Sequence, residues 1–519
     1  MTPTLTHSQA HGLESPLCHA LDKPRSDFTR EDLLRLIAEG HIERITFHYT
    51  ALDGKYKELK LPVMSVAQAE RVLAEGERVD GSSLFRGMVD AELSDLYVVP
   101  VYRSAFLNPF DDASLDFTCR YLKGDGDRVA FAPDNILHKA SRLLTHYTGL
   151  ELEALGELEF FLLSEAPHPQ LYPAESQAHY HASAPFAKNG ELLDEMVRLL
   201  AQITGAVKYG HAEVGVIDSV RSGVEEIRGR RAEQLEIEFL PMPIEDCGDA
   251  LVLARWLVRN LAWRRGVVAT FAPKLEDGVA GNGLHIHMQL TRDGRNVMTD
   301  GGGLSLEARQ LIGGLCEYAP SLTAFGNTEA ASYLRLVPNQ EAPTRVCWSD
   351  MNRSAMIRVP LAWSNLSDLA SLANPQQQGK FFHDPEARQT VELRTADGSA
   401  LVHLLLAGIA LGVAHGLTSD DSIETTARLH VGKDFRHDAE RAAELPLLPN
   451  SCAESARLLL EKRALYEKEG VFPPSVIEYV ERLLRAEDDA HVHQQLRRLD
   501  PGERAEHVRK IMHRHLHRH

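Results

Sequence analysis

The chain has 519 residues, of which 44% are hydrophobic and 25% charged, a composition typical of a folded protein with more than one domain. Its 74 acidic and 56 basic residues leave a formal net charge of −18, which excludes a general attraction to nucleic acid or to anionic membranes. Six cysteines without a CxxC pair argue against a zinc ribbon or a disulfide scaffold and favour a reducing, cytoplasmic location.

The N-terminal part of the chain predicts a loose tail and then a helix. Residues 1–27 are polar and are expected to form a disordered tail. Thr29 then has the position of an N-cap, with Asp32 three residues on in the pattern of a capping box. The apolar period that follows ends at Gly40, which is typical of a helix end.

A hairpin and a larger mixed region follow the first helix. Residues 42–47 and 56–61 have strand patterns on either side of a turn, which indicates a β-hairpin. Helices are expected over 135–147, 196–203 and 251–267, and strands over 152–163, 235–240, 285–290, 357–360 and 391–394.

The C-terminal part of the chain is expected to be mostly helical. The longest apolar run, 401–417, includes two histidines and is too short for a bilayer span, so it predicts a buried helix. Residues 420–519 are charged and predict further helices, and the final HRHLHRH is interpreted as a solvated tail.

Paired carboxylates on one strand are the first chemical signal. Glu157 and Glu159 lie two residues apart in GELEFFLL, so both side chains point to the same face of a strand. Neighbouring carboxylates repel each other, and a sheet interior retains them when a cation compensates their charge. A strand with one solvated face explains this motif, taken alone, at least as well.

Four more motifs repeat the pattern of two polar residues on one strand face. They are His211 with Glu213, Glu236 with Glu238, His285 with His287, and Glu392 with Arg394. Each is weak alone, because a single strand histidine is more often a core residue than a ligand. Together they predict an oxygen-rich site that suits Mg²⁺ or Mn²⁺ better than zinc.

The densest motif is SYLRLVPNQEAPTRVCWSDMNRSAMIRVP, residues 332–360. It brings Arg335, Arg353 and Arg358 close in sequence to Glu341. Guanidinium groups match carboxylates and phosphates, so the motif predicts anion binding. Ordinary surface ion pairing is the alternative, and the apolar neighbours disfavour it.

These motifs together resemble the glutamine synthetase family, from about residue 42 to about residue 480. RLVPNQEAP and NRSAMIRVP resemble the family's RLVPGYEAP and NRSASIRIP, VDGSS followed by LSD resembles its DGSS loop, and KLEDGVAGNGLHIH resembles its ATP-region signature. The resemblance implies an α+β fold. A small N-terminal β-grasp-like domain over 28–132 would precede a large catalytic domain over 133–519, with a curved antiparallel sheet and surrounding helices.

The resemblance implies ATP-dependent ligation of ammonia to the γ-carboxylate of glutamate through γ-glutamyl phosphate, with two divalent cations. The implied ligands are Glu159, Glu213 and Glu236 for one cation, and Glu157, His285 and Glu392 for the other. The implied ATP contacts are Arg353, Arg358, His287 and Lys274, and the implied glutamate contacts are Arg335, Arg394 and Gly281. Asp80, Asp95 and Tyr180 would bind ammonium, and Glu341 would close over the site.

The resemblance also implies a ring-shaped homo-oligomer, a dodecamer of two stacked hexamers, with active sites between subunits. Two departures from the family lie near the site. Glu213 and Glu236 are 23 residues apart, which leaves Glu225 or Glu226 as competing ligands. Arg358 and Glu392 are 34 residues apart, and basic ATP contacts are replaced there, with Arg388 as a possible substitute.

Two other functions are compatible with the motifs. The departures are the reason to retain a γ-glutamyl ligase for a small amine or polyamine, which would use the same phosphoryl chemistry with a different acceptor pocket. A non-catalytic relative with a structural role is the third hypothesis, and the complete set of implied metal ligands argues against it.

Overall fold

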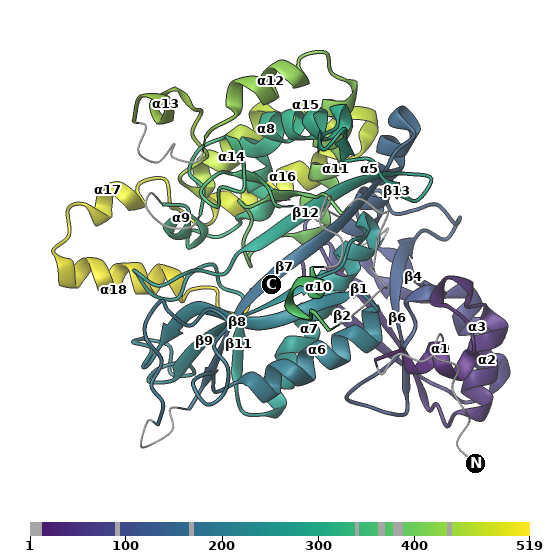
Figure 1. Ribbon diagram of the computed structural model, residues 1–519. Coiled ribbons are helices and arrows are strands. Elements are labelled where there is room, and N and C mark those ends of the chain that lie inside the picture. Colours follow the sequence, from purple (N-terminus) through teal and green to yellow (C-terminus); the bar gives the residue numbers. More distant parts are fainter. Residues whose placement is uncertain are drawn as a thin grey trace.

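The computed structural model describes residues 13–88, 94–165, 171–337, 342–361, 369–376, 388–432 and 439–518. Two sheets divide the molecule (Figure 1): a small sheet near the N-terminus and a larger, curved sheet flanked by most of the helices. The arrangement is the α+β class expected from the sequence. Glu341 lies outside the described residues.

The N-terminal sheet has the strand order β2-β1-β6-β4-β3, with β5 paired to β6. Its strands are β1 Arg44–Thr50, β2 Tyr56–Pro62, β3 Glu77–Asp80, β4 Asp95–Pro100, β5 Phe106–Leu107 and β6 Ser114–Leu122. The predicted hairpin is confirmed, because β1 and β2 pair antiparallel, while β1 and β6 are parallel. The helices of this part are α2 Arg30–Glu39, α3 Val66–Glu75 and α4 Gly81–Leu84.

The predicted start of helix α2 is confirmed in detail. The Thr29 side chain accepts a hydrogen bond from the Asp32 backbone, and the Asp32 carboxylate accepts one from the Thr29 backbone at 2.9 Å. This reciprocal capping box satisfies two backbone donors that the helix leaves free. Gly40 ends the helix, as expected.

The loose tail expected over residues 1–27 is wrong for the part that the structure describes. Residues 16–21 form α1 (Pro16–Leu21), whose Leu17 and Leu21 are buried in the main core. A short 3₁₀ turn, Arg25–Asp27, follows, and Arg25 donates through Nη2 to the Gln202 carbonyl at 2.7 Å. Two leucines spaced one helical turn apart supply the apolar contact of this segment with the core.

The large sheet has the strand order β16-β17-β18-β12-β7-β9-β8. Its strands are β7 Glu151–Ser164, β8 Val207–Ile217, β9 Arg231–Phe239, β12 Leu284–Arg292, β16 Trp348–Asp350, β17 Ile357–Val359 and β18 Val391–Leu393, with β10 Met242–Pro243, β11 Val268–Thr270 and β13 Arg295–Asn296 attached. A separate two-stranded sheet pairs β14 Thr299–Asp300 with β15 Gly303–Leu304. All five strands predicted for this region are present. The sheet is not wholly antiparallel, because β16 and β17 pair in parallel.

Helices pack around the large sheet (Figure 1), and their apolar side chains form a hydrophobic core with those of the sheet. They are α5 Pro133–Thr148, α6 Gly190–Thr204, α7 Ile244–Arg264, α8 Leu306–Gly326, α9 Ser332–Arg335, α11 Val402–Thr418, α12 Ser422–Leu429, α13 Ala439–Glu444, α14 Cys452–Glu461, α15 Arg463–Glu467, α16 Pro474–Arg485, α17 Val492–Leu496 and α18 Pro501–Met512. The predicted buried helix is α11, which is buried along nearly its whole length. No described helix is by itself long and apolar enough to cross a bilayer, and α11 with α12 would meet that test only as a pair bent by 108°.

The C-terminal HRHLHRH is not a solvated tail in the residues that the structure describes. Residues 513–518 return to the body of the molecule, where Leu516 is only 5% exposed. The Leu516 carbonyl accepts a hydrogen bond from Thr270 Oγ1 at 2.7 Å, and His515 pairs with the buried Glu487 at 3.0 Å. Sequence polarity alone misses this docking, because a single leucine among basic residues supplies the apolar contact.

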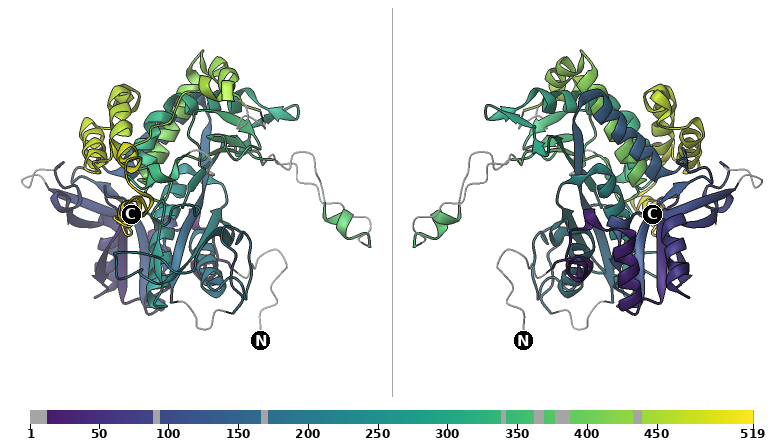
Figure 2. Two further views of the ribbon diagram at one scale, coloured as in Figure 1. Left: turned by 90° about the vertical axis from the view of Figure 1, so that its left-hand side faces the viewer. Right: turned by 90° about the vertical axis from the view of Figure 1, so that its right-hand side faces the viewer.

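Helix α10 (Ala370–Ala373) is the described part of the second long spacing, between Arg358 and Glu392. Figure 2 shows it away from the body of the molecule, beyond the edge of the large sheet. Its Leu372 is largely exposed. The neighbouring residues 362–368 and 377–387 lie outside the described part of the chain.

Candidate functional site

Strand register brings the predicted carboxylates and histidines to one face of the large sheet. His285 on β12 lies opposite Glu157 on β7, and Glu159 on β7 lies opposite Glu236 on β9. Glu392 on β18 lies opposite His287 on β12. Since side chains alternate along a strand and paired residues share a face, these groups project to the same side.

One group of three consists of Glu157, His285 and Glu392, whose ligand atoms all lie within 4.8 Å of one another. His285 Nδ1 lies 2.8 Å from a Glu157 oxygen and 3.6 Å from a Glu392 oxygen. His287 lies beside the group, with Nε2 3.0 Å from Glu157 and Nδ1 3.0 Å from Thr390 Oγ1. The structure therefore brings together one complete set of implied metal ligands.

A second group consists of His211, Glu213 and Glu236, again with ligand atoms within 4.8 Å. The sequence assigned Glu159 rather than His211 to this set. Glu159 lies next to it, where its carboxylate accepts hydrogen bonds from Gln234 Nε2 and from the Gly283 backbone, both at 2.9 Å. His211 Nε2 lies 3.3 Å from Glu236.

Two residues without an assigned role belong to this face. His211 completes the second group, and Glu238 joins Glu157 and Glu236 in a third group of close ligand atoms. Glu238 is paired with Lys208 Nζ at 2.8 Å. The signal that identifies both was in the sequence, because each lies two residues from a predicted ligand on the same strand.

The competing ligands Glu225 and Glu226 lie elsewhere. Both are exposed on the loop between β8 and β9, and Glu226 pairs with His517 at 2.9 Å. Glu236 instead faces Glu159 across the β7–β9 pair. The geometry favours Glu236 over either alternative.

The electrostatics of this face would suit a bound cation. Burial, with Glu236 and Glu213 nearby, raises the pKa of Glu159 well above its usual range. Burial, with Glu157 and Glu213 nearby, does the same to the pKa of Glu236. Carboxylates that are buried together in this way favour proton uptake unless cations offset their charge. The oxygen-rich donor set, with one imidazole in each of the first two groups, fits Mg²⁺ or Mn²⁺.

A cavity of about 400 Å³ opens beside the second group. Glu159, Glu213 and His285 line one part of it, and the remaining wall includes Gly281, Arg335 and Arg394. All three implied glutamate contacts therefore reach one cavity that also borders the carboxylates. The cavity therefore places arginines, which suit anions, next to carboxylates, which suit cations.

Arg335 and Gly281 are held closely in that wall. Arg335 donates through Nη1 to the Thr395 carbonyl at 3.1 Å, and its Nη2 lies 3.4 Å from His285 Nε2. A Cβ added to Gly281 would lie 2.2 Å from the Pro273 carbonyl, so only glycine fits there. Lys274 is fully buried beside them, and burial, reinforced by Arg335, lowers the pKa of its amine to about 8.

The other implied anion contacts lie at the β16–β18 end of the sheet. Arg358 donates to Glu392 at 2.9 Å, and Arg394 donates to the other oxygen of the same carboxylate. Arg394, together with His287 and His285, outweighs the effect of burial and lowers the pKa of Glu392. Arg353 is exposed in the bend before β17.

The implied ammonium-binding residues are divided between the two parts of the molecule. Asp80 and Asp95 face each other at the end of the β3–β4 pair in the N-terminal sheet. Ser82 and Ser83 donate to Asp80 and lower its pKa to about 2, while Asp95 pairs with Arg78 at 3.1 Å. Tyr180 lies at the large sheet instead, with its ring centroid 5.3 Å from that of His211.

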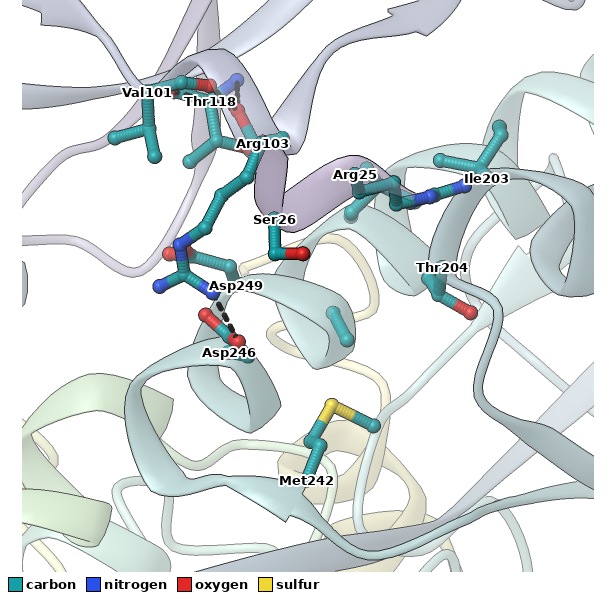
Figure 3. Close-up of a pocket in the computed structure, with 13 residues that line it drawn as sticks. Arg25, Ser26, Val101, Arg103, Thr118, Ile203, Thr204, Met242, Asp246 and Asp249 are labelled. Carbon is teal, nitrogen blue, oxygen red and sulfur yellow. Dashed lines mark hydrogen bonds and ion pairs between the residues drawn. The ribbon is translucent and has the colours of Figure 1, made fainter. Parts of the chain in front are cut away.

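Another cavity, of about 220 Å³, lies where the N-terminal part meets α6 and α7 (Figure 3). Arg103 points into it and pairs with Asp246, and Asp249 lies beside them. Asp249 is in turn paired with Arg120 at 2.5 Å. The basic and acidic side chains at this cavity thus neutralise one another in pairs.

Comparisons with known proteins agree with this geometry. A family model described as "Glutamine synthetase, beta-Grasp domain" matches residues 41–124, and one described as "Glutamine synthetase, catalytic domain" matches residues 130–498. The glutamine synthetase of Mycolicibacterium smegmatis is 27% identical over 488 residues, which cover 87% of this chain and 93% of that protein.

Solved structures share the fold. A Plasmodium falciparum glutamine synthetase aligns with a TM-score of 0.70 at 19% identity, over 92% of this chain and 98% of that one. The ligand-free structure of GmaS aligns with a TM-score of 0.67 at 22% identity, over 91% of this chain and 98% of that one. With both family models in order along the chain, this protein belongs to the glutamine synthetase family.

Proposed function

We propose that the protein ligates ammonia to the γ-carboxylate of glutamate, with cleavage of ATP to ADP and γ-glutamyl phosphate as the activated intermediate. The observation that carries this proposal is the row of buried carboxylates and histidines on one sheet face, next to a cavity with two arginines. Such a face suits the transfer of a phosphoryl group, which depends on positioning and on charge stabilisation.

The donor set fits two divalent cations, Mg²⁺ or Mn²⁺. We assign Glu157, His285 and Glu392 to one cation, and Glu159, Glu213 and Glu236 to the other, with His211 as an added donor. When bound, the cations supply neutralisation of the phosphate charge. The carboxylates have fixed positions, because each lies on a strand of the sheet.

The remaining polar residues divide between the two larger substrates. Gly281, Arg335 and Arg394 reach one cavity, and we assign them to the amino-acid end of glutamate. We assign Arg353, Arg358 and His287 to the ATP phosphates. The sequence also assigned Lys274 to ATP, but its fully buried side chain beside Gly281 supports a place behind the wall of the glutamate cavity. Closure by Glu341 stays a prediction.

The ammonium site requires a second subunit in this proposal. Asp80 and Asp95 belong to the N-terminal sheet, whereas Tyr180 lies beside the second carboxylate group. A ring-shaped homo-oligomer, two stacked hexamers by resemblance, would bring the Asp80 loop of one subunit to the Tyr180 of its neighbour. Inactive Asp80→Ala and Glu157→Ala proteins, dissociated and reassembled together, should then regain part of the activity, because some mixed sites carry neither change.

A small amine is the second candidate acceptor, and the rings around Tyr180 favour it. Tyr180 stacks on His181 with centroids 4.1 Å apart, and Tyr209 lies 5.6 Å from His211 on the other side. Both tyrosines are more than 40% exposed. Aromatic faces next to carboxylates attract organic ammonium groups.

Phosphate release from ATP, glutamate and Mg²⁺ tests the two acceptors directly, with ammonia and a panel of small amines in parallel. Fastest turnover with ammonia supports glutamine synthesis. Turnover with one amine and not with ammonia supports the second candidate, and Tyr180→Ala should then raise the KM for that amine. Absence of turnover with every acceptor would favour a non-catalytic relative.

Two further expectations belong to this proposal. We also propose the domain boundary between residues 132 and 133, directly before α5 begins, and separate expression of the two parts tests it. A cytoplasmic location is supported by six free cysteines, five of them buried, and cell fractionation tests it.

A further inference from the structure

A small apolar cluster continues the carboxylate face of the large sheet beyond Glu159. Three segments that are distant in sequence build it on β7. Its buried members include Phe161 and Leu163 from β7, Val220 and Ile227 from the loop 218–230, Ala272 and Leu275 from the segment after β11, and Leu516 from the C-terminal residues. The loop 218–230 is the extra stretch that separates Glu213 from Glu236. Leu516, near the C-terminus, thus helps to bury Val220 and Ile227 of this loop.

His513 joins the same three segments by hydrogen bonds. Its Nε2 lies 2.8 Å from the Leu275 carbonyl, which only accepts, so Nε2 carries the proton. Its Nδ1 then accepts from Ser222 Oγ at 3.0 Å. Burial lowers the pKa of His513 and so favours this neutral form. The imidazole links the loop 218–230 to the backbone one residue after Lys274.

Two more bonds attach the C-terminus to the segment 270–276. Thr270 Oγ1 donates to the Leu516 carbonyl at 2.7 Å. Arg509 Nε, on α18, lies 3.1 Å from both oxygens of Glu276. The segment therefore has a C-terminal contact at each end, and the residues that lead to Gly281 begin directly after it.

Helix α18 also packs against the segment that carries Arg335. Val508, Ile511 and Met512 share a cluster with Ala330 and Leu334. Glu487 supports this contact, because it accepts from the Ala330 backbone at 3.1 Å and pairs with Arg518 at 2.6 Å. Arg335 follows Leu334 directly in α9.

We propose that α18 and residues 513–518, here named the C-terminal clamp, position the Gly281 wall and Arg335 for binding of the amino-acid substrate, with His513 and Leu516 as positioning residues. The clamp holds the segments on two sides of the cavity, whereas the metal-binding strands are held by the sheet itself. This inference rests on the proposed function for the assignment of Gly281 and Arg335 to glutamate. A small displacement of such groups weakens substrate binding without a change in the chemical groups.

His513→Ala removes both imidazole hydrogen bonds and tests the clamp. We expect the KM for glutamate to rise about tenfold while the KM for ATP stays the same, in line with loss of substrate positioning. His513→Gln, whose amide again donates toward the Leu275 carbonyl, should restore most of the glutamate KM. His507→Ala, on the adjoining helix α18, is the matched control and should leave both KM values unchanged. Equal KM values for glutamate in His513→Ala and wild type would overturn the proposal.

Hydrogen–deuterium exchange separates failure of the clamp from failure of the proposed function, because it requires no turnover. His513→Ala should exchange faster than wild type in residues 273–283 and 330–337, and at the same rate in β7 and β12. Thr270→Val, which removes the donor to the Leu516 carbonyl, should give the same pattern if His513→Ala does not fold. Unchanged exchange in both segments would contradict the clamp even for an enzyme with a different substrate.

Discussion

Two buried polar regions of this protein differ in which charged groups lie next to each other. At the junction of the N-terminal part with α7, Asp249 is paired with Arg120 at 2.5 Å and with His403 at 3.1 Å, and Arg103 pairs with Asp246. On the face of the large sheet, each of the three groups of close ligand atoms contains two or three carboxylates. The junction contains counter-charges for its carboxylates, whereas Glu159 and Glu236 on the sheet face lie among other carboxylates.

The pKa values of the carboxylates in the two regions are shifted in opposite directions. Burial alone would raise the pKa of Asp249, but Arg120 and His403 outweigh it and lower the pKa to about 2. At Glu159 and Glu236, burial and neighbouring carboxylates act in the same direction and raise both pKa values well above the usual range. Buried carboxylates that lack internal compensation therefore distinguish the functional face from a structural ion-pair network.

The largest effect is expected at the junction. Asp249→Asn would leave Arg120 and His403 without their carboxylate in a buried place, so we expect the free energy of unfolding to fall by about 3–5 kcal/mol. Urea unfolding measures this. Glu461→Gln, in the exposed pair with Arg457, is the control and should cost less than about 1 kcal/mol. Equal losses in the two variants would show that the junction charges do not stabilise the fold.

Unlike Asp249→Asn, Glu236→Gln should reduce activity without a loss of stability. It removes an uncompensated carboxylate from the functional face, so phosphate release should fall by about 10²–10³-fold, the scale of one lost electrostatic contact. The melting temperature of the metal-free protein should stay the same or rise, since like charges no longer meet. Glu151→Gln, exposed at the start of β7, is the matched control for both measurements. A large drop in melting temperature would show that Glu236 stabilises the fold, as Asp249 is expected to do.

Cation binding should stabilise the protein through the functional face alone. At about one hundred times the dissociation constant, Mg²⁺ or Mn²⁺ should add about 3 kcal/mol to the free energy of unfolding. Thermal unfolding after removal of metal with a chelator, followed by titration, measures the gain. Glu157→Gln, which changes a carboxylate shared by two groups, should reduce it, and Asp249→Asn should not. An equal gain in Glu157→Gln and wild type would argue against this cation site.

The smallest effect concerns acid. Asp249 has an ordinary pKa of 3.8 and a folded pKa of about 2, so the unfolded chain binds more protons between these values. Its stabilisation is fully present above about pH 4 and is lost as the pH falls toward 2, by about 2 kcal/mol. Urea unfolding at a series of acidic pH values should show this loss in wild type and not in Asp249→Asn. A parallel decline in both proteins would assign the acid sensitivity to other groups.

Local rules predicted much of the fold. The Thr29 capping box, the β1–β2 hairpin and the buried α11 each follow from the preferences of a few consecutive residues. The period of two along β7 and β12 also predicted which side chains share a face. It could not predict that His211, rather than Glu159, would complete the close group with Glu213, because that depends on the register of β8 against β9.

By itself, the sequence determined the element types, the family motifs and the polar residues of each strand, because these depend on neighbours along the chain. Tertiary structure alone decided that residues 13–27 and 513–518 are docked. It also decided that Glu225 and Glu226 lie away from the site and that the charges at α7 are paired. The physical reason is that burial and charge compensation depend on groups hundreds of residues apart, such as Ser222 and His513, whose contact no local pattern encodes.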